Sequence, residues 1–528
     1  MKVLVSDQIS EQGVSKLREK AVVDVFTDLS PAQLLEIIPD YEALVVRSST
    51  KVTRQVLEAG INLKVVGRAG VGVDNIDVDA ATQRGIIVIN APEGNTISAA
   101  EHAIAMMTSL ARNIPAAASS MKAREWKRSK FMGVELNKKT LGLVGLGRIG
   151  SEVVKRAKAM GMDIIAYDPY ISAERAEKLG VTLAGLEEIY RNADFITLHT
   201  PLTKSTYHII GEKELAMMKP GVRLINCARG GLIDEQALCA ALISGRVAGA
   251  ALDVFEEEPP VDNPLCGLEN VIVTPHLGAS TEEAQVNVAV QVAEQVINAL
   301  LGEPLLTAVN VPVIPPETLA DVKPFIPLMK TLGSLYTQVF NGQVEAVEIL
   351  YSGEIANYPV TPLTNSFLIG LLSVILNETI NYVNAPVVAK QRGIKVREVI
   401  SKSVENFTNL ISVNVKTAEG TQTIAGTLYN KHDVRIVQIG KYRLEVVPSR
   451  YMLVTTYVDM PGVIGRFGTA LGNNTINIAG MQVGRQSIGG EAVMVLQVDS
   501  PVDENILAQL QKLDAVLTVR LVKIDVAQ

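Results

Sequence analysis

The sequence predicts an α/β protein: two parallel-sheet, Rossmann-like domains with a cleft between them, then an α+β domain and a C-terminal ferredoxin-like domain. Three observations predict this fold class. Short runs of Val, Ile and Leu alternate with helical stretches over residues 1–310, which is typical of parallel sheets covered on both faces. A glycine-rich turn lies inside this region, at 145–150. After residue 450 the predicted elements follow the order βαββαβ, which is the ferredoxin-like pattern.

The first α/β unit precedes the glycine turn, and the second contains it. In the first unit, strands are expected at 3–6, 22–26, 43–47, 63–67 and 86–90, and helices at 9–19, 31–37 and 53–59. In the second unit, strands are expected at 140–145, 163–168, 194–199, 223–226, 248–253 and 271–274, and a helix at 151–160. Helical stretches at 98–111 and 281–301 are expected to join the units, so that the active site lies in the cleft between them.

A proline-rich linker at 311–317 separates these units from the rest of the chain. In the third domain we expect a helix at 367–375 and strands at 344–351, 434–439 and 443–447, with no catalytic cluster. In the fourth we expect strands at 451–458, 476–483, 492–498 and 516–524, and helices at 462–471 and 505–511. The predicted domain boundaries are therefore 1–97 with 282–310, 98–281, 311–450 and 451–528.

Composition narrows the class of protein. A chain of 528 residues suggests about three or four domains. The net charge of −7, without a long basic run, argues against nucleic acid or an anionic membrane as a partner. The 3 cysteines (Cys227, Cys239 and Cys266) form no CxxC pair, which favours a reducing compartment, the cytoplasm, and disfavours a disulfide framework or a metal site. We expect no signal peptide, because the chain opens on a strand, and no membrane span, because the apolar stretch 367–376 is too short.

The run from Gly145 to Gly150 predicts a dinucleotide site. An apolar strand precedes Gly145-Leu-Gly147-Arg-Ile-Gly150, a helix follows it, and Asp168 ends the next strand at about the expected ~20-residue offset. The glycines let the backbone approach a pyrophosphate, and the N–H groups of Arg148 and Ile149 at the helix start attract its charge. Asp168 can bond a ribose 2′-hydroxyl and repels a 2′-phosphate, which favours NAD over NADP. The alternative is a purely structural glycine turn.

Three side chains near strand ends could perform the chemistry that NAD implies. Oxidation of an alcohol needs a base for the hydroxyl proton and a cation for an adjacent carboxylate. Arg229 follows one strand, His276 follows another, and Glu258 lies in a Glu-Glu-Glu-Pro-Pro run. Each also has a plainer interpretation: a surface arginine, a core histidine bonded to a carbonyl, and a glutamate in a solvated turn.

The glycine motif, residues 226–233 and residues 275–280, in this order and spacing, resemble the D-isomer-specific 2-hydroxyacid dehydrogenases. The resemblance implies that Arg229 binds the substrate carboxylate and carbonyl, that His276 is the acid/base, and that Glu258, the glutamate directly before Pro259, orients the imidazole. It also implies cofactor contacts from Gly145, Gly147, Arg148, Ile149, Gly150, Asp168, Thr200, Cys227, Ala228, Arg229, Asp253, His276, Gly278 and Ala279.

A narrower resemblance covers the whole chain. Residues 67–75 (Gly-Arg-Ala-Gly-Val-Gly-Val-Asp-Asn), 46–49 and 131–133 look like those of the long-form D-3-phosphoglycerate dehydrogenases. This implies NAD-dependent oxidation of 3-phosphoglycerate to 3-phosphooxypyruvate, the first step of phosphorylated serine biosynthesis. Arg47, Arg68, Gly70 and Arg128 are then the expected substrate contacts, although each arginine has a surface interpretation too. Val71 stands where several relatives have a threonine whose side chain can touch the cofactor phosphate or the substrate. Only this one side-chain contact of the family pattern is in doubt here.

The second half of the chain resembles regulatory modules of the same family. Residues 311–450 are similar to an allosteric substrate-binding domain, and residues 451–528 to an ACT domain. The resemblance implies that Tyr457, Asp459 and Asn477 bind serine as a feedback effector, usually between two subunits, whereas Asp459 alone could merely cap a helix. It also implies a homo-oligomer, a tetramer, in which exposed sheet edges pair.

Two other functions remain open from the sequence. One is a different D-2-hydroxyacid dehydrogenase, such as a hydroxypyruvate or glyoxylate reductase. The other is a binding protein that senses NADH through the same fold. The regulatory half and the set of arginines argue against the reductase, and the full Arg, Glu and His set argues against the sensor.

Overall fold

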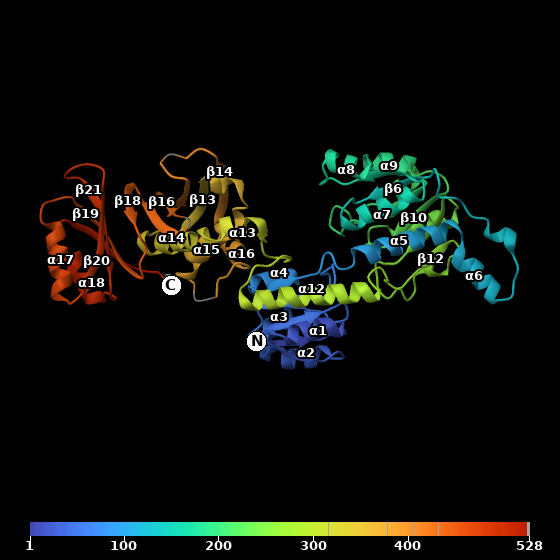
Figure 1. Cartoon of the computed structure of the whole chain (residues 1–528), viewed down its shortest axis with the longest axis horizontal. Coiled ribbons are helices and arrows are strands. Elements are labelled where there is room, and N and C mark those ends of the chain that lie inside the picture. The colour runs from blue at the N-terminus through green and yellow to red at the C-terminus, as the bar shows by residue number, and fades with distance from the viewer. Residues whose placement is uncertain (315, 377–378, 405, 431, 525–528) are drawn as a thin grey trace.

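The computed structural model describes residues 1–314, 316–376, 379–404, 406–430 and 432–524. Pro315 of the predicted linker and residues 525–528 of the predicted last domain lie outside these ranges, as do 377–378, 405 and 431 of the predicted third domain. The α/β domain that holds the glycine turn, the N-terminal α/β domain, the third and the fourth follow one another along the long axis (Figure 1). The four sheets confirm the predicted fold class, whereas the domain boundaries stay predictions. Among the described residues, no helix has both the length and the apolar character needed to cross a bilayer.

The first sheet is parallel, with strand order β2-β1-β3-β4-β5. Its two faces are covered by different helices, so the inner strands β1, β3 and β4 are buried on both sides as their Val- and Leu-rich sequences predict, whereas the edge strand β2 is partly exposed. The strands are β1 (Lys2–Val5), β2 (Val22–Val25), β3 (Ala43–Val46), β4 (Val65–Arg68) and β5 (Ile87–Ile89). The helices are α2 (Pro31–Ile37), α3 (Arg54–Ala59) and α4 (Val78–Gln83) on one face, and α1 (Glu11–Arg18) and α12 (Glu282–Leu301) on the other. The chain thus returns through α12 to the first domain, as predicted.

The second sheet is also parallel, with strand order β12-β11-β10-β9-β6-β7-β8. The strands are β6 (Thr140–Val144), β7 (Asp163–Tyr167), β8 (Thr182–Leu183), β9 (Phe195–Leu198), β10 (Val222–Asn226), β11 (Val247–Leu252) and β12 (Val271–Val273). The helices are α5 (Thr96–Ala111), α7 (Arg148–Ala159) and α8 (Ala173–Leu179) on one face, and α9 (Leu186–Asn192), α10 (Glu212–Met217) and α11 (Glu235–Ile243) on the other. The order reverses between β6 and β9, and such a switch point is where doubly wound sheets bind ligands.

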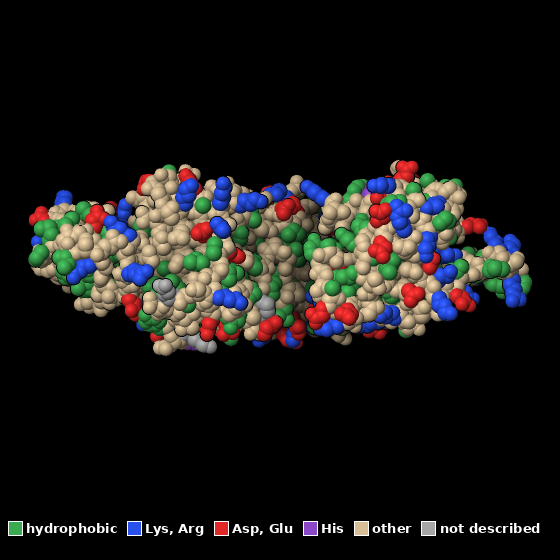
Figure 2. Space-filling model, turned by 90° about the horizontal axis from the view of Figure 1, so that it is seen from above, with side chains coloured by type: hydrophobic (Ala, Val, Ile, Leu, Met, Phe, Trp, Pro, Cys, Tyr) green, Lys and Arg blue, Asp and Glu red, His purple; other side chains and the backbone are tan. Residues whose placement is uncertain are grey.

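An arm that the sequence analysis did not predict projects from the second domain. It consists of α6 (Ile114–Lys122) and a 3₁₀ turn at Arg128–Phe131, and it lies at the end of the molecule farthest from the fourth domain (Figure 1). The Trp126 side chain is 80% exposed and Met132 is 85% exposed. Acidic and basic side chains are interspersed over the body, whereas basic side chains gather on the arm (Figure 2).

The third and fourth domains share one hydrophobic core. Leu328 and Leu332 of α14 (Phe325–Val339) belong to the same buried cluster as Met452 and Val522 of the fourth domain. The six-stranded sheet has the order β14-β13-β15-β16-β17-β18, and the four-stranded sheet has the order β20-β21-β19-β22. The first comprises β13 (Val344–Gly353), β14 (Lys395–Ser401), β15 (Asn409–Thr417), β16 (Gly420–Tyr429), β17 (Asp433–Ile439) and β18 (Tyr442–Val446). The second comprises β19 (Tyr451–Val458), β20 (Ile478–Arg485), β21 (Glu491–Val498) and β22 (Val516–Lys523).

The remaining helices of this half are α13 (Pro316–Val322), α15 (Thr361–Ser373), α16 (Ala385–Gln391), α17 (Val463–Asn473) and α18 (Glu504–Gln511). The predicted helix at 367–375 is the second half of α15, and the three strands predicted for the third domain are β13, β17 and β18. The sequence analysis missed β14, β15 and β16. The edge strand β14 is largely exposed, and β16 is rich in Thr and Gly, so neither has a strong apolar signal.

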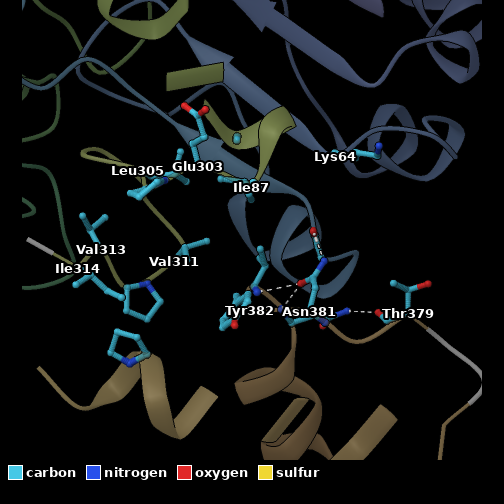
Figure 3. A pocket seen from close by; sticks show the side chains of 18 of the residues that line it. Lys64, Ile87, Glu303, Leu305, Val311, Val313, Ile314, Thr379, Asn381 and Tyr382 are labelled. Atoms are coloured by element: carbon cyan, nitrogen blue, oxygen red, sulfur yellow. Dashed lines mark hydrogen bonds between the residues drawn. The ribbon is translucent and has the colours of Figure 1, made fainter. Parts of the chain in front are cut away.

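The half of the chain that holds the third and fourth domains meets the first domain across a hollow of about 920 Å³ (Figure 3). Apolar side chains of the linker, including Val311, Val313 and Ile314, line one side, and Asn381 lies on the other. The Asn381 amide donates a 2.8 Å hydrogen bond to the carbonyl oxygen of Gly85, which follows α4. Direct contact between the two halves is therefore narrow.

Gly67 provides a test of how α12 packs on the first sheet. A Cβ atom at Gly67 would lie 2.6 Å from Val296 Cγ2 and 2.7 Å from Val292 Cγ1, and both valines are fully buried. We expect Gly67→Ala to lower the free energy of unfolding by about 1–3 kcal/mol, because the valines must leave their rotamers. Chemical denaturation measures this. Gly267→Ala is the control, since nothing lies within 4 Å of a Cβ atom there; equal midpoints for the two variants would contradict the packing argument.

Candidate active site

The candidate residues converge because all strands of the second sheet are parallel. Gly145 follows β6, Asp168 follows β7, Thr200 comes just after β9, and the carboxyl ends of these strands lie at one edge. The segment Cys227 to Arg229 follows β10, Asp253 follows β11, and the 274–279 segment follows β12. The sheet thus brings together, along one edge, residues that are more than a hundred positions apart in the chain.

The glycine turn fits a dinucleotide pyrophosphate. Gly145 has a φ of +98°, and a Cβ atom at Gly150 would lie 2.2 Å from the Gly145 carbonyl oxygen, so the turn itself requires both glycines. Gly147 is different: nothing in the chain lies within 4 Å of where its Cβ atom would be. No side chain caps α7, whose N-cap is Gly147. The first N–H groups of α7 therefore face a space that a phosphate can fill.

Asp168 supports the same turn. Its carboxylate accepts 2.9 Å hydrogen bonds from the backbone N–H groups of Leu146 and Tyr170. The acid therefore lies beside the glycine turn, where an adenosine ribose would be placed in a dinucleotide fold.

Arg229 lies in a loop that Asn226 shapes. The Asn226 amide donates to the Arg229 carbonyl at 2.8 Å, and its oxygen accepts from the Ala228 N–H at 3.1 Å. A Cβ atom at Gly230 would lie 1.8 Å from the Phe255 carbonyl oxygen, so only glycine fits there. The Arg229 Nε atom is 3.2 Å from Asp74 Oδ2 of the first domain. Arg229 therefore faces the junction between the two α/β domains.

His276 and Glu258 form a hydrogen-bonded pair. His276 Nδ1 is 2.8 Å from Glu258 Oε2, and Glu258 Oε1 accepts from the Phe255 N–H at 3.1 Å. Partial burial raises the pKa of the Glu258 carboxyl, but the hydrogen bond and charge of His276 outweigh it and hold that pKa below its usual value. An ionised Glu258 accepts a hydrogen bond from Nδ1–H, which leaves Nε2 of His276 free as a base. Glu256, by contrast, pairs with His208 at 2.9 Å and takes no part in this site.

Asp253 is a buried carboxylate beneath the His276 loop. It accepts from the N–H of Leu277 at 2.7 Å, the N–H of Gly278 at 2.8 Å and the hydroxyl of Thr274 at 2.6 Å. Burial raises the pKa of the Asp253 carboxyl, but these bonds and His102 lower it below its usual value. Burial and the charge of Asp253 raise the pKa of the neighbouring Cys227 thiol, so Cys227 carries no reactive thiolate.

The first domain contributes two arginines. Arg47 follows β3, and Arg68 ends β4 with its Nε bonded to Asn75 Oδ1 at 2.9 Å. The Arg68 guanidinium folds over Gly70, where a Cβ atom would lie 2.3 Å from Nη1. Burial, and then the charge of Arg229, lowers the pKa of Arg68 to about 10. Cations crowded in this way are stabilised when an anion binds between them.

Arg128 is not part of this cluster. The structure places it in the 3₁₀ turn of the projecting arm, exposed and away from the first domain (Figure 1). Within one chain Arg128 does not meet Arg47 and Arg68, because the arm leads away from the junction rather than into it, and its phosphate contact stays a prediction.

Sequence reasoning missed several supporting residues. Asn75 holds Arg68 and also bonds the carbonyls of Arg47 and Thr50, and the buried Asp7 accepts from the Arg47 N–H at 2.6 Å. His102 contacts Asp253 from α5. Asn75 ends the motif at residues 67–75 that the sequence analysis singled out for Arg68. Its position in that motif was therefore a usable signal. The contacts of Asp7 and His102 arise only in three dimensions.

The three residues predicted to bind serine do not form one site within the chain. Asp459 follows β19 and pairs with Arg485 at 2.9 Å, whereas Asn477 precedes β20 and donates to Asp499 at 2.6 Å. Because β19 and β20 both pair antiparallel with β21, these two residues lie at opposite ends of the sheet. Tyr457 is only 1% exposed, within the core under α17 and α18. Asp459 does not cap α17, whose N-cap is Gly462 without a side-chain bond.

Family models match three segments of the chain. Residues 104–278 match the NAD-binding domain of the D-isomer-specific 2-hydroxyacid dehydrogenases, residues 321–440 the intervening domain of D-3-phosphoglycerate dehydrogenase, and residues 451–515 the ACT domain. The first match confirms the predicted cofactor, NAD.

Full-length relatives extend the likeness over the whole chain. A D-3-phosphoglycerate dehydrogenase of Synechocystis is 48% identical over 99% of this chain and 95% of its own length. One of Methanocaldococcus jannaschii is 49% identical over 99% of this chain and all (100%) of its own. Among solved structures, a glyoxylate reductase from Paecilomyes thermophila (34% identity, TM-score 0.55) covers 58% of this chain and 98% of its own. A D-lactate dehydrogenase from Aquifex aeolicus, complexed with NAD and lactic acid (30%, TM-score 0.52), covers 57% of this chain and 96% of its own.

Cofactor preference tests the position of Asp168. Asp168→Asn keeps an acceptor oxygen for one of the two backbone N–H groups, which bond different carboxylate oxygens, and removes the charge that repels a 2′-phosphate. We expect the ratio of kcat/KM for NAD to that for NADP to fall by about tenfold, equivalent to about 1.4 kcal/mol of lost repulsion. Asp163→Asn makes the same charge change at an exposed position on β7 and should leave the ratio unaltered. An unaltered ratio in Asp168→Asn would remove Asp168 from the ribose site.

Proposed function

The chain belongs to the D-3-phosphoglycerate dehydrogenase family, and from that premise we propose that it oxidises D-3-phosphoglycerate with NAD to 3-phosphooxypyruvate, as the entry step of serine biosynthesis. The observation that carries this proposal is the pairing of two sites across one junction: Arg229, Glu258 and His276 on the second domain, and Arg47 and Arg68 on the first. A substrate with a carboxylate at one end and a phosphate at the other matches cations on both sides. The 3 free cysteines are compatible with the cytoplasm, where we place the enzyme.

Arg229 binds the substrate carboxylate in this proposal. Its planar guanidinium can hold two oxygens at once and fix the orientation of the neighbouring carbinol carbon. Asp74 Oδ2 lies 3.2 Å from Arg229 Nε. A substrate carboxylate that binds Arg229 therefore replaces Asp74 as its ion-pair partner. Arg47 and Arg68 hold the phosphate end.

His276 acts as the base. Its Nδ1–H is donated to Glu258, which leaves Nε2 to accept the hydroxyl proton of the substrate. Glu258 stabilises the imidazolium that results and keeps the ring in that tautomer. When NAD is bound, it supplies the acceptor for the hydride that leaves the same carbon.

The two alternative functions are less well supported. The solved glyoxylate reductase covers 58% of this chain, whereas the D-3-phosphoglycerate dehydrogenase of Synechocystis covers 99% of it. A binding protein that merely senses NADH has no need for a Glu258–His276 pair at 2.8 Å.

Turnover of 3-phosphoglycerate with NAD, followed by NADH absorbance, tests the proposal. We expect Arg229→Lys to lower kcat/KM by about 10²- to 10³-fold, because a point charge cannot replace a two-point clamp.

We expect His276→Ala to lower kcat by about 10²- to 10⁴-fold while NADH still binds. Arg223→Lys, on β10 but over the Phe195 ring, is the matched control.

Preferential turnover of unphosphorylated hydroxy acids by the wild-type protein would favour the reductase instead. Wild-type turnover in either site variant would exclude that residue from the mechanism.

We propose further that the chain works as a homo-oligomer, a tetramer, regulated by serine. Asp459 and Asn477 lie at opposite ends of one sheet, so a site that uses both needs a second copy. The exposed Trp126 and Met132 of the arm are apolar surface of the kind that another copy covers. In an oligomer, Arg128 could also reach the junction between the two α/β domains of another copy.

Serine should bind and inhibit only through that inter-subunit site. We expect calorimetry to detect serine binding to the full chain, and Asp459→Ala or Asn477→Ala to abolish both binding and inhibition. Asp514→Asn, an exposed acid in the same domain, is the control. A light-scattering mass of 56.7 kDa, that of one chain, or unchanged serine binding in both variants would contradict the proposal. Deletion from residue 451 is not a clean test, because it uncovers the core shared with α14.

A further inference from the structure

We propose that His102 is a positioning residue for the oxidation: from α5 it holds the buried Asp253, and through Asp253 it holds the His276 loop in its working geometry. This inference rests on the role proposed above for His276 and extends it to a residue outside the site.

The His276 loop is strained. His276 has a φ of +55°, in the left-handed region that is uncommon for a side chain of its size. Such a conformation is unfavourable by itself and persists only where the surroundings over-determine it.

Asp253 provides much of those surroundings. Its carbonyl oxygen accepts from the His276 N–H at 2.9 Å, and its carboxylate accepts from the next two N–H groups, those of Leu277 and Gly278. Three consecutive N–H groups of the loop thus end on one residue. The Asp253 side chain is 0% exposed, so no water replaces a lost partner at low cost.

His102 is the one imidazole donor that the structure gives this carboxylate. Its Nε2 atom is hydrogen-bonded to Thr274 Oγ1 at 3.2 Å and lies within ion-pair distance of Asp253 Oδ1, also at 3.2 Å; Thr274 Oγ1 in turn donates to the same carboxylate. An ionised carboxylate only accepts, so Nε2 carries the proton. The His102 side chain is 19% exposed, and its bond is among those that keep the pKa of Asp253 low despite burial. Without His102, Asp253 is a buried charge short of a donor.

The position of His102 on α5 links the His276 loop to the helix that joins the two α/β domains. The α5 helix begins where the first domain ends, and Ser98 in its first turn donates to the Gly278 carbonyl at 2.9 Å. Two side chains of one inter-domain helix therefore hold opposite ends of the loop that carries His276. The placement of the base depends on the helix that joins the domains.

The test compares substitutions at position 102 in the full-length protein. The Gln side chain places an amide N–H where His has Nε2, whereas the amide of Asn ends one position earlier, and Leu has no donor. We expect His102→Leu and His102→Asn to lower kcat by about ten- to hundredfold, with KM for 3-phosphoglycerate unaltered. His102→Gln should restore kcat. The control is Glu101→Gln, also on α5, which disturbs only a surface ion pair with Arg156 of α7. This variant should match the wild type.

Hydrogen exchange gives a readout that does not depend on activity. Peptides that cover residues 274–280 should exchange faster in His102→Leu and His102→Asn, and at the wild-type rate in His102→Gln. Equal behaviour of the Asn and Gln variants in both measurements would overturn the proposal, even if Leu fails to fold. If the wild type does not oxidise 3-phosphoglycerate, the proposed function fails while the exchange data still decide whether His102 holds the loop.

Discussion

The site depends on one geometric constraint: every strand of the second sheet runs in the same direction. Backbone pairing fixes that direction, and the carboxyl ends of β6, β7, β9, β10, β11 and β12 therefore open on one edge. Each element then needs to add only one or two side chains. The demanding local features, such as the close approach of Gly230 to Phe255 and the left-handed backbone of His276, occur at that edge because the rigid sheet behind it can sustain them.

Local patterns were sufficient to predict much of this arrangement. The strand, glycine turn, helix and acid around Gly145 and Asp168 are contiguous in the chain, so their geometry follows from short-range rules. Arg229, Glu258 and His276 were found for a related reason, since each lies in a short motif that resembles a family motif. Strands β14 and β16 were missed because their residues alternate weakly and their burial is decided by neighbours, whereas β15, in which Ile411, Val413 and Val415 alternate with polar residues, carried a signal that was overlooked.

Features that require the folded chain were out of reach of sequence reasoning. His102 meets Asp253 across 151 positions only because α5 packs beside β11 and β12, and no pattern around either residue indicates the contact. Arg128 looked like a substrate residue because its basic run resembles a binding segment, yet the arm directs it outward. Asn477 and Asp459 are close in sequence but are separated by the length of a strand, which only the antiparallel pairing with β21 reveals.

The core that α14 shares with the fourth sheet has an evolutionary consequence. The glyoxylate reductase, 98% of whose length aligns with 58% of this chain, is a protein without a counterpart for the rest of it. The regulatory half of this chain divides less easily. One buried core contains Met452, Val454 and Val522 together with Leu328 and Leu332. A gene break between residues 450 and 451 would therefore expose an apolar surface on each of the two fragments. Recombination at the linker near residue 311 severs little by comparison. The last two domains of this chain are therefore expected to stay together when genes recombine.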